Sequence, residues 1–364
     1  MFKFTPKKVL FFLILSFSLI ETKAQDIQFS MFYAVPLYIN PAFAGSRHAN
    51  RAMLHHRFQW ASQEGRYYTT MASFDTYSMK YNSGIGAMLM YDYGNTLTST
   101  ILQLQYAYEL RLNSVHTLRF GLQGGFMQTA VSSLTLPQDV SNDGLSGKKS
   151  FGGTNFFAPD ISAGILWYAK RLYVSLSFHH LNRPQYSLLN NSDSRWPTKL
   201  TLTGGYKIPI RFGGDDGTHT VPVTMSVTPT ITYKKQMGAV GPYFEGTGSG
   251  DQVDLGIYYT YNWLIAGLWY RGIPFTGLKD ERTGRVYNNN ESVVFLIGAS
   301  YQSFGVGYAY DLTVSTQSTR TGGSHEINLS YVFRTKHTKK PLKSLPCPDF
   351  EYEILQRGSA GRAK

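Results

Sequence analysis

The chain has 364 residues and a formal net charge of +12, and it is rich in aromatic residues (15%) and poor in charged ones (16%). Most of the net charge lies at the two ends, which leaves about +4 on residues 25–333. With no basic helix in that region, the composition argues against a nucleic-acid-binding protein. The single cysteine, Cys347, excludes a scaffold held together by disulfide pairs.

The first predicted element is an export signal. Lys3, Lys7 and Lys8 precede an apolar run at residues 9–20, and Thr22-Lys23-Ala24 suits cleavage before Gln25. This arrangement predicts a secretory signal peptide over residues 1–24. The apolar run is shorter than the roughly 20 residues that a membrane-spanning helix needs, so we expect no transmembrane helix in the mature chain.

Residues 25–50 form the second predicted element, an N-terminal segment with neither helix nor strand periodicity. It is rich in aromatic residues and prolines. Its Asn40-Pro41 dipeptide favours a turn and disfavours helix at Asn40. Nothing in the segment indicates catalysis, so its role depends on what the following residues build.

From Arg51 to Phe333 the sequence alternates with a period of two, which is typical of β-strands. In the clearest case, residues 102–110, Leu and Tyr alternate with Gln, Ala and Glu, so one face is apolar and the other polar. We expect about fourteen antiparallel strands, many near the length of about ten residues with which a tilted strand spans a bilayer. The predicted strands cover residues 51–60, 66–77, 84–93, 97–111, 115–129, 160–170, 172–181, 197–208, 219–233, 252–261, 263–271, 292–302, 304–314 and 324–333.

The connections between these strands alternate in length. They are tight after the second, fourth, sixth, tenth and twelfth strands, and long over residues 130–159, 182–196, 234–251 and 272–291. Short turns on one side and long polar loops on the other are typical of an all-β outer-membrane barrel with periplasmic turns and extracellular loops. A soluble β-sandwich also has alternating strands, but it gives no reason for loop lengths to alternate.

Aromatic residues near the predicted strand ends favour the barrel, because such barrels carry aromatic girdles at both membrane interfaces. After Phe333 the strand pattern stops, and residues 334–364 form a basic tail that we expect on the periplasmic side. The predicted girdle residues are Trp60, Tyr91, Tyr93, Trp167, Trp263 and Trp269.

The sequence indicates no catalytic or metal site. The pairs His55-His56 and His179-His180 lie on predicted strands, where adjacent side chains point to opposite faces and cannot share one ion. The glycine-rich stretches at residues 213–217 and 246–250 lack, respectively, spaced calcium ligands and a following helix. We therefore expect neither a metal nor a cofactor.

The run QDIQFSMFYAVPLYINPAFAGS, residues 25–46, resembles the mature N-terminus of the PorP/SprF family, outer-membrane barrels of the Bacteroidetes type IX secretion and gliding apparatus. FGVGYAYDLTVS at 304–315, followed by GSHEINLSYVF at 323–333, resembles the family's closing hairpin. The candidate site residues are Phe29, Tyr33, Pro36, Tyr38, Asn40, Pro41, Phe43 and Gly45 of the N-terminal motif, and Ile327, Leu329, Tyr331 and Phe333 of the closing strand.

A fourteen-stranded barrel leaves interior space to be filled, and the aromatic rings of the N-terminal segment need burial. We therefore expect this segment at the periplasmic mouth, folded inward or lying across the rim. Phe29, Tyr33, Tyr38 and Phe43 are its expected anchors on the inner wall, and the segment serves as a plug or as a docking element for a partner.

The resemblance implies a non-enzymatic component, located in the outer membrane, that assists export of specific cell-surface proteins or anchors them at the surface. The implied partners are an exported adhesin or enzyme with a secretion domain, other type IX secretion components on the periplasmic side, and outer-membrane lipid. The strand pattern leaves two alternatives open. One is a diffusion channel or transporter of hydrophobic compounds, and the other is a barrel hydrolase, for which no local motif selects a Ser and His pair.

Overall fold

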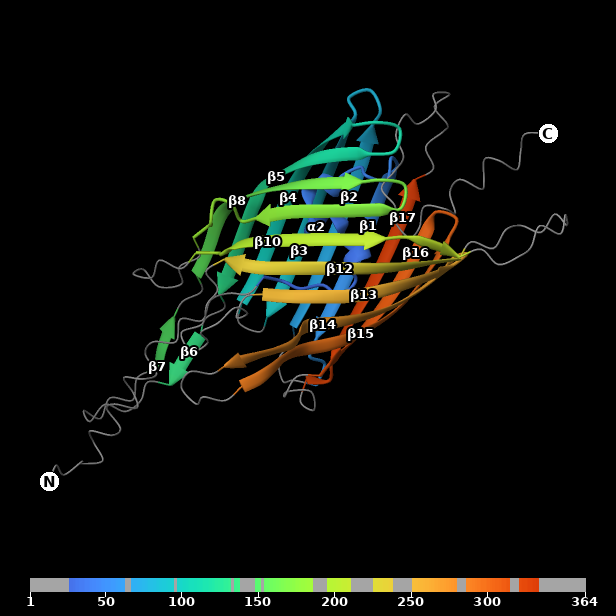
Figure 1. Ribbon diagram of the computed structural model, residues 1–364. Helices are drawn as coiled ribbons and strands as arrows, with labels where there is room; N and C mark the ends of the chain where they lie inside the picture. Colours follow the sequence, from blue (N-terminus) through green and yellow to red (C-terminus); the bar gives the residue numbers. More distant parts are fainter. Residues whose placement is uncertain are drawn as a thin grey trace.

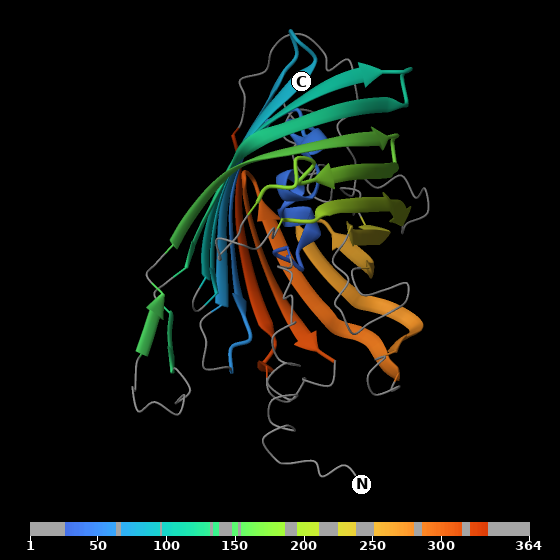
Figure 2. The ribbon, with the colours of Figure 1, turned by 90° about the vertical axis from the view of Figure 1, so that its left-hand side faces the viewer.

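Fourteen long antiparallel strands wrap into a closed ring, with the helical turns of the N-terminal segment inside it (Figures 1 and 2). The ring closes because the first long strand pairs with the last, from Asn50 opposite Phe333 to Gln59 opposite Ser324. The computed structural model describes residues 26–62, 67–94, 97–131, 134–137, 148–151, 154–185, 195–210, 225–237, 251–279, 286–314 and 321–333.

The strands follow one another around the ring in chain order, each antiparallel to the next. Two further strands, β6 (Leu134–Pro137) and β7 (Lys148–Phe151), form a separate ribbon. The ring consists of β1 (Asn50–Gln59), β2 (Tyr67–Ser78), β3 (Ser83–Gly94), β4 (Leu97–Arg111), β5 (Thr117–Val131), β8 (Thr154–Tyr168), β9 (Leu172–His179), β10 (Thr198–Tyr206), β12 (Met225–Met237), β13 (Asp251–Tyr261), β14 (Leu264–Lys279), β15 (Val286–Tyr301), β16 (Phe304–Thr313) and β17 (Ser324–Phe333), with the short β11 (Ile208–Ile210) beside β12.

Alternation along each strand determines which side chains face outward. On β4, Leu102 and Leu104 are 48% and 62% exposed, whereas Gln103 and Gln105, which alternate with them, are buried. An apolar exterior around a polar, filled interior is the reverse of a soluble barrel and matches a barrel surrounded by lipid. The predicted outer-membrane barrel fold, with about fourteen strands, is therefore confirmed.

The two ends of the barrel differ. Tight connections at residues 79–82, 112–116, 169–171, 262–263 and 302–303 lie at one end, which we call the short-turn end. We call the opposite end, where β5 is followed by β8 and β9 by β10, the long-loop end. Strand β1 begins at the short-turn end, and β17 finishes there.

Two predicted long loops are shorter than expected. Strands β5 and β8 include the residues at the two ends of the loop expected at 130–159. Most of the loop expected at 272–291 belongs to β14 and β15. Strands β14 and β15 continue past irregular pairing at Arg271 and Gly272 (Figure 1). The prediction ended these strands where apolar alternation ends, but the backbone ladder continues beyond that point. The loops expected at 182–196 and 234–251 lie largely outside the described residues.

One predicted girdle residue is misplaced. Trp263 is 51% exposed at the β13–β14 turn, as an interfacial residue should be, but Trp269 is only 1% exposed. Trp269 points into the lumen, where its ring lies 5.2 Å from that of Tyr258. Its outward-facing neighbour Leu268 is 47% exposed. The alternation of β14 therefore places Trp269 inside, and proximity to a strand end was a weaker guide than alternation.

No helix in the described part of the chain is long and apolar enough to cross a membrane. A substitution on the outer face of a strand tests contact with lipid. Leu104 lies at the middle of β4 and points outward, and we expect Leu104→Arg to destabilise the barrel by about 2–4 kcal/mol, because a midplane arginine must leave water for hydrocarbon.

Urea unfolding of the protein in lipid vesicles measures this effect. Leu104→Phe is the matched control, since it changes the shape of the side chain at the same site and keeps it apolar. Equal unfolding free energies for the Arg and Phe variants would contradict the assignment of this face to lipid.

Candidate functional site

The N-terminal segment runs through the barrel interior. We call residues 26–49 the lumen segment. Its first residue contacts β10 and the end of β9 at the long-loop end, and it reaches the short-turn end, where Gly45 contacts β2. Figure 2 shows its helical turns, in blue, enclosed by the strands. The segment is therefore folded inward, one of the two arrangements expected, and it extends along the lumen from one end to the other instead of staying at one mouth.

Three short helical turns shape the middle of the lumen segment. They are a 3-10 turn at Phe32–Ala34, α2 at Pro36–Ile39 and a 3-10 turn at Pro41–Phe43. Pro36 and Pro41 begin the second and third turns, where the missing N–H of proline costs nothing. Asn40 is extended between them, and its side-chain oxygen accepts from the Ala42 N–H at 2.8 Å, which caps the third turn.

Near the long-loop end, charged residues of the wall hold Ser30. Glu326 on β17 accepts from the backbone N–H groups of Ser30 and Met31, at 2.6 and 3.0 Å. The Ser30 hydroxyl donates to Asp311 on β16 at 2.9 Å and accepts from Arg57 on β1 at 2.8 Å. Arg57 also pairs with Glu326. Three strands that meet at the closure of the ring therefore share one contact point on the segment.

Arg271 on β14 completes this arrangement. It donates to Asp311 at 2.9 Å, to the Phe29 carbonyl at 3.2 Å and to the Ser30 hydroxyl at 3.2 Å. All these side chains are buried, so each charge depends on its partners. We call Arg57, Arg271, Asp311 and Glu326 the Ser30 clamp.

A second cluster of charged side chains holds Asp26, the first residue that the structure describes. Its carboxylate lies 2.8 Å from Lys199 Nζ and 3.2 Å from His180 Nε2. His180 in turn lies 2.8 Å from Asp160. Burial by itself would raise the pKa of Asp26, but Lys199 and His180 outweigh it and lower that pKa well below its usual range. Burial by itself would lower the pKa of His180, but Asp26 and Asp160 raise it to about 9. Both groups therefore carry charge at neutral pH.

The four aromatic residues singled out in the sequence contact other rings. Phe29 packs edge-on against Tyr38, with ring centroids 5.0 Å apart. Their remaining contacts are to the wall or to another part of the segment: Phe29 with His55, Tyr33 with Tyr258, Phe43 with Tyr173, and Tyr38 with Lys199 and the Ile27 carbonyl.

Asn40 fixes the lower half of the segment to the wall. Its amide nitrogen donates to the backbone carbonyls of Ile165 on β8 and Leu176 on β9, both at 3.0 Å. The wall has a glycine where the segment approaches most closely. A Cβ added to Gly164 would lie 2.0 Å from the Asn40 side chain, and one added to Gly121 would lie 2.2 Å from the Ala42 nitrogen.

At the short-turn end, ionic contacts hold the last residues of the segment. Arg119 on β5 donates to the Ala42 carbonyl at 3.0 Å and to Glu109 at 2.6 Å. The Gly45 N–H donates to Asp75 on β2 at 2.9 Å. Gly45 has φ +67, and a Cβ there would lie 2.5 Å from the Thr76 carbonyl oxygen. A residue other than glycine would therefore be strained at this position.

The closing-strand residues proposed from the sequence do not join the lumen segment. Ile327, Leu329 and Phe333 are more than 40% exposed on the outer face, and Tyr331 also points outward. The residues between them face the lumen, where Glu326 belongs to the clamp and Asn328 bonds the Ala34 carbonyl at 3.5 Å. Sequence reasoning missed the Ser30 clamp, although a carboxylate on an inward position of a membrane strand is itself a signal of function.

One of the two histidine predictions is wrong. His55 is buried and His56 exposed, on opposite faces of β1 as expected. His179 and His180 are both buried, because β9 ends at His179 and His180 has φ +57, which turns its side chain inward. Among the described residues, no group of three or more His, Cys, Asp or Glu is placed to hold a metal ion.

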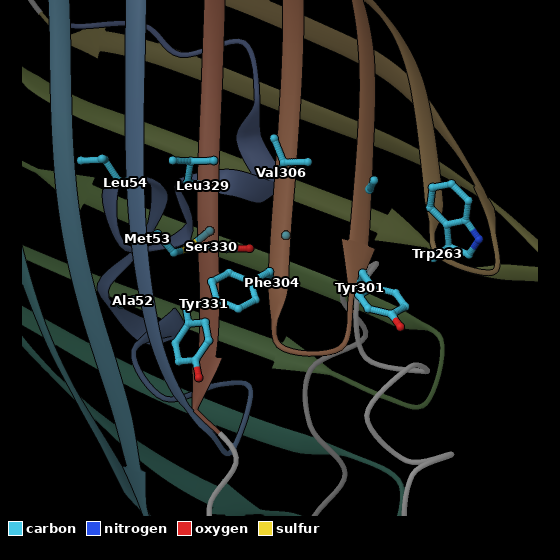
Figure 3. Close-up of a pocket in the computed structure, with 12 residues that line it drawn as sticks. Ala52, Met53, Leu54, Trp263, Tyr301, Phe304, Val306, Leu329, Ser330 and Tyr331 are labelled. Atoms are coloured by element: carbon cyan, nitrogen blue, oxygen red, sulfur yellow. The ribbon is translucent and has the colours of Figure 1, made fainter.

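An apolar groove of about 810 Å³ lies on the outer face near the short-turn end. Figure 3 shows Tyr301, Phe304 and Tyr331 near the β15–β16 turn, with Leu329 and Leu54 further along the wall. These side chains suit contact with lipid hydrocarbon. They supply no acid, base or metal ligand, so the groove does not compete with the lumen as a candidate functional site.

Comparison with known proteins gives one family and a set of similar folds. The model of the family described as "Type IX secretion system membrane protein PorP/SprF" matches residues 21–331. No curated protein matches the chain. Solved structures with a similar fold include the CymD monoaromatic hydrocarbon channel (12% identity, TM-score 0.45, covering 84% of this chain and 94% of that one). They also include a Pseudomonas aeruginosa FadL homologue (12% identity, TM-score 0.43, covering 81% and 93%) and the Pseudomonas putida toluene transporter TodX (10% identity, TM-score 0.42, covering 86% and 96%).

Proposed function

Because the chain belongs to the PorP/SprF family of type IX secretion system membrane proteins, we propose that it assists export of specific cell-surface proteins or anchors them at the surface. Membership confirms the resemblance noted in the sequence and makes the chain an outer-membrane β-barrel of that secretion system. The family description is that of a membrane protein and names no enzymatic activity. The proposed role is accordingly non-enzymatic.

The observation that supports this role is the lumen segment. Phe29, Met31, Val35 and Leu37 are each at most 1% exposed. A barrel whose interior is filled by a segment of its own chain is poorly suited to passive diffusion of solutes. Its surfaces at the two ends, and the segment itself, remain as the places where it can act on other proteins.

The two ends are assigned to different partners. We place the long-loop end outside the cell, facing the exported protein, and the short-turn end in the periplasm, facing other secretion components. The basic tail at residues 334–364 follows β17 at the short-turn end and belongs to the periplasmic side in this proposal. Residues 1–24 serve as the cleaved export signal, and lipid surrounds the outer face.

The decisive experiment removes the protein from its host and compares the proteins displayed at the cell surface. We expect a few specific surface proteins to disappear while other exported proteins remain. A transport channel for small molecules would instead leave the displayed set unchanged and reduce uptake of its solute. An unchanged surface set would therefore contradict the proposed role.

The lumen segment is expected to be needed for this function. We expect the double variant Tyr38→Ala with Phe43→Ala to assemble as a barrel but to reduce display of the dependent proteins, because both rings anchor the segment and neither belongs to a strand. Assembly is measured by the shift in gel mobility on heating, and display by labelling of intact cells.

The matched control is Tyr108→Ala with Phe120→Ala. These residues are cross-strand neighbours on β4 and β5, and both are 43% exposed on the outer face. The control removes the same two ring types without touching the lumen. Normal display in the lumen variant would reduce the segment to a passive filler.

A further inference from the structure

The Ser30 clamp recognises mostly main-chain atoms. Glu326 accepts from two successive N–H groups, those of Ser30 and Met31, and Arg271 donates to the carbonyl of Phe29. Only one side-chain group of the segment, the Ser30 hydroxyl, takes part. These contacts would form with any peptide that bends at a small hydroxyl residue, as the segment does at Ser30.

The clamp does not depend on the segment for its own charge balance. It has two arginines and two carboxylates, and they pair with one another: Arg57 with Glu326, and Arg271 with Asp311 at 2.9 Å. Arg57 also lies 3.4 Å from Asp311. The four side chains come from β1, β14, β16 and β17 of a closed ring, so the site is preorganised before a peptide enters.

The upper and lower halves of the segment have separate contacts with the wall. Residues 40–45 sit against wall glycines, and a Cβ added to Gly84, for example, would lie 1.8 Å from the Ala44 carbonyl oxygen. Residues 26–31 have no helical turn, and the wall holds them at Asp26, at the Ser30 clamp and at Gln28, which contacts Gln252. The lower half has contacts of its own, from Asn40 to β8 and β9, from Arg119 to Ala42 and from Gly45 to Asp75, so displacement of residues 26–31 would leave it anchored.

We propose that the Ser30 clamp is a binding site for a peptide that enters from the long-loop end and bends at a hydroxyl residue, and that residues 26–31 occupy it as an internal substitute until such a peptide displaces them. This inference rests on the proposed function, since the long-loop end is where an exported protein would be held. It adds which groups of the incoming chain the clamp would bind, namely two N–H groups, one carbonyl and one hydroxyl.

Two synthetic peptides test the site. One has the sequence Asp-Ile-Gln-Phe-Ser-Met of residues 26–31, acetylated and amidated. The matched control carries N-methyl groups on its Ser and Met nitrogens, which removes the two donors that Glu326 accepts. The receptor is the full chain with residues 26–31 replaced by a glycine-serine stretch, and binding is followed by fluorescence anisotropy of a labelled peptide.

We expect the unmodified peptide to bind and N-methylation to weaken binding at least about 100-fold, because two hydrogen bonds to a charged group are lost. A second measurement uses the intact segment, with Gln28→Cys in a Cys347→Ser background. Gln28 is half-buried and contacts Gln252 on β13 at 3.4 Å. The unmodified peptide should accelerate labelling of Gln28→Cys by a bulky maleimide, and the methylated peptide should not.

The proposal is overturned when an assembled receptor binds neither peptide or binds both equally. If the replaced segment prevents assembly, judged by the heat shift in gel mobility, the Gln28→Cys measurement decides alone, and labelling rates that neither peptide changes overturn the proposal. These readouts need no secretion partner. They fail separately from the proposed function, whose failure appears as an unchanged set of surface proteins after deletion of the gene.

Discussion

Glu326→Ala is expected to lower the unfolding free energy of the protein by about 3–5 kcal/mol, the range found when one partner of a buried ion pair is removed. The substitution takes away the acceptor of two backbone N–H groups and the closest partner of Arg57. It also leaves His55 Nε2, now 3.2 Å from Glu326, without that carboxylate. All of these groups lie where the first and last strands of the ring meet, so the substitution weakens the contact between β1 and β17 that closes the ring.

Equilibrium unfolding in detergent or lipid vesicles measures this loss, with the heat shift in gel mobility as a check on assembly. Glu326→Gln is the conservative control, because it keeps an acceptor oxygen in place but gives up the charge, and it should lie between the wild type and the Ala variant. Ile327→Ala is the control for strand position, since its side chain is 49% exposed to lipid. An Ala variant at Glu326 no less stable than Ile327→Ala would show that the clamp adds nothing to closure.

Gly121→Leu is expected to expel the lower half of the lumen segment. A Cβ at this position would lie 2.2 Å from the Ala42 nitrogen and 2.5 Å from the Pro41 carbonyl carbon. Both are backbone atoms of a turn that Asn40 ties to β8 and β9. They cannot shift by a side-chain rotation, so the segment must move away from β5.

The same strand supplies the control. Gly124 lies three residues further along β5, and a Cβ added there would have no atom within 4 Å. We expect Gly124→Leu to leave the segment in place. Backbone amide hydrogen exchange over residues 40–46 measures the effect, as rapid exchange in the Gly121 variant and wild-type protection in the Gly124 variant. Equal protection in both variants would show that the wall adapts and that the glycine is not required by the fit.

The strands were predictable from sequence because residues that face lipid alternate with residues that face the lumen. Every outward residue of β4 from Leu102 to Leu110 is Leu or Tyr, and the alternation alone determines both the strand and its orientation. Where a strand extends beyond the lipid, its outward residues need not be apolar and the alternation ends. For this reason the predicted strands were shorter than β5, β8, β14 and β15. Alternation also outweighs the tendency of tryptophan near a strand end to lie at the membrane interface, as the inward-facing Trp269 shows.

The lumen segment was predictable only as a motif. The prolines and Asn40 indicated turns, and the structure has turns there. The partners of the segment were not predictable, because they are distant in sequence: Ser30 and Glu326 are 296 positions apart. No local pattern links such residues. Only the closed register of β1 with β17 brings Arg57 and Glu326 together, and that register follows from the whole ring.

The path of the lumen segment, together with the leader predicted at residues 1–24, leads us to propose an order of events in assembly. An even number of strands would normally leave both chain ends on one side of the membrane, but here Asp26 lies at the long-loop end and Phe333 at the short-turn end. A precursor still tethered to the inner membrane by residues 1–24 would have Asp26 held in the periplasm, on the side to which we assign the short turns. The segment could then not be threaded. In this proposal, the predicted cleavage before Gln25 precedes filling of the barrel, and removal of the leader acts as a timing step that keeps the interior vacant until the protein has left the inner membrane.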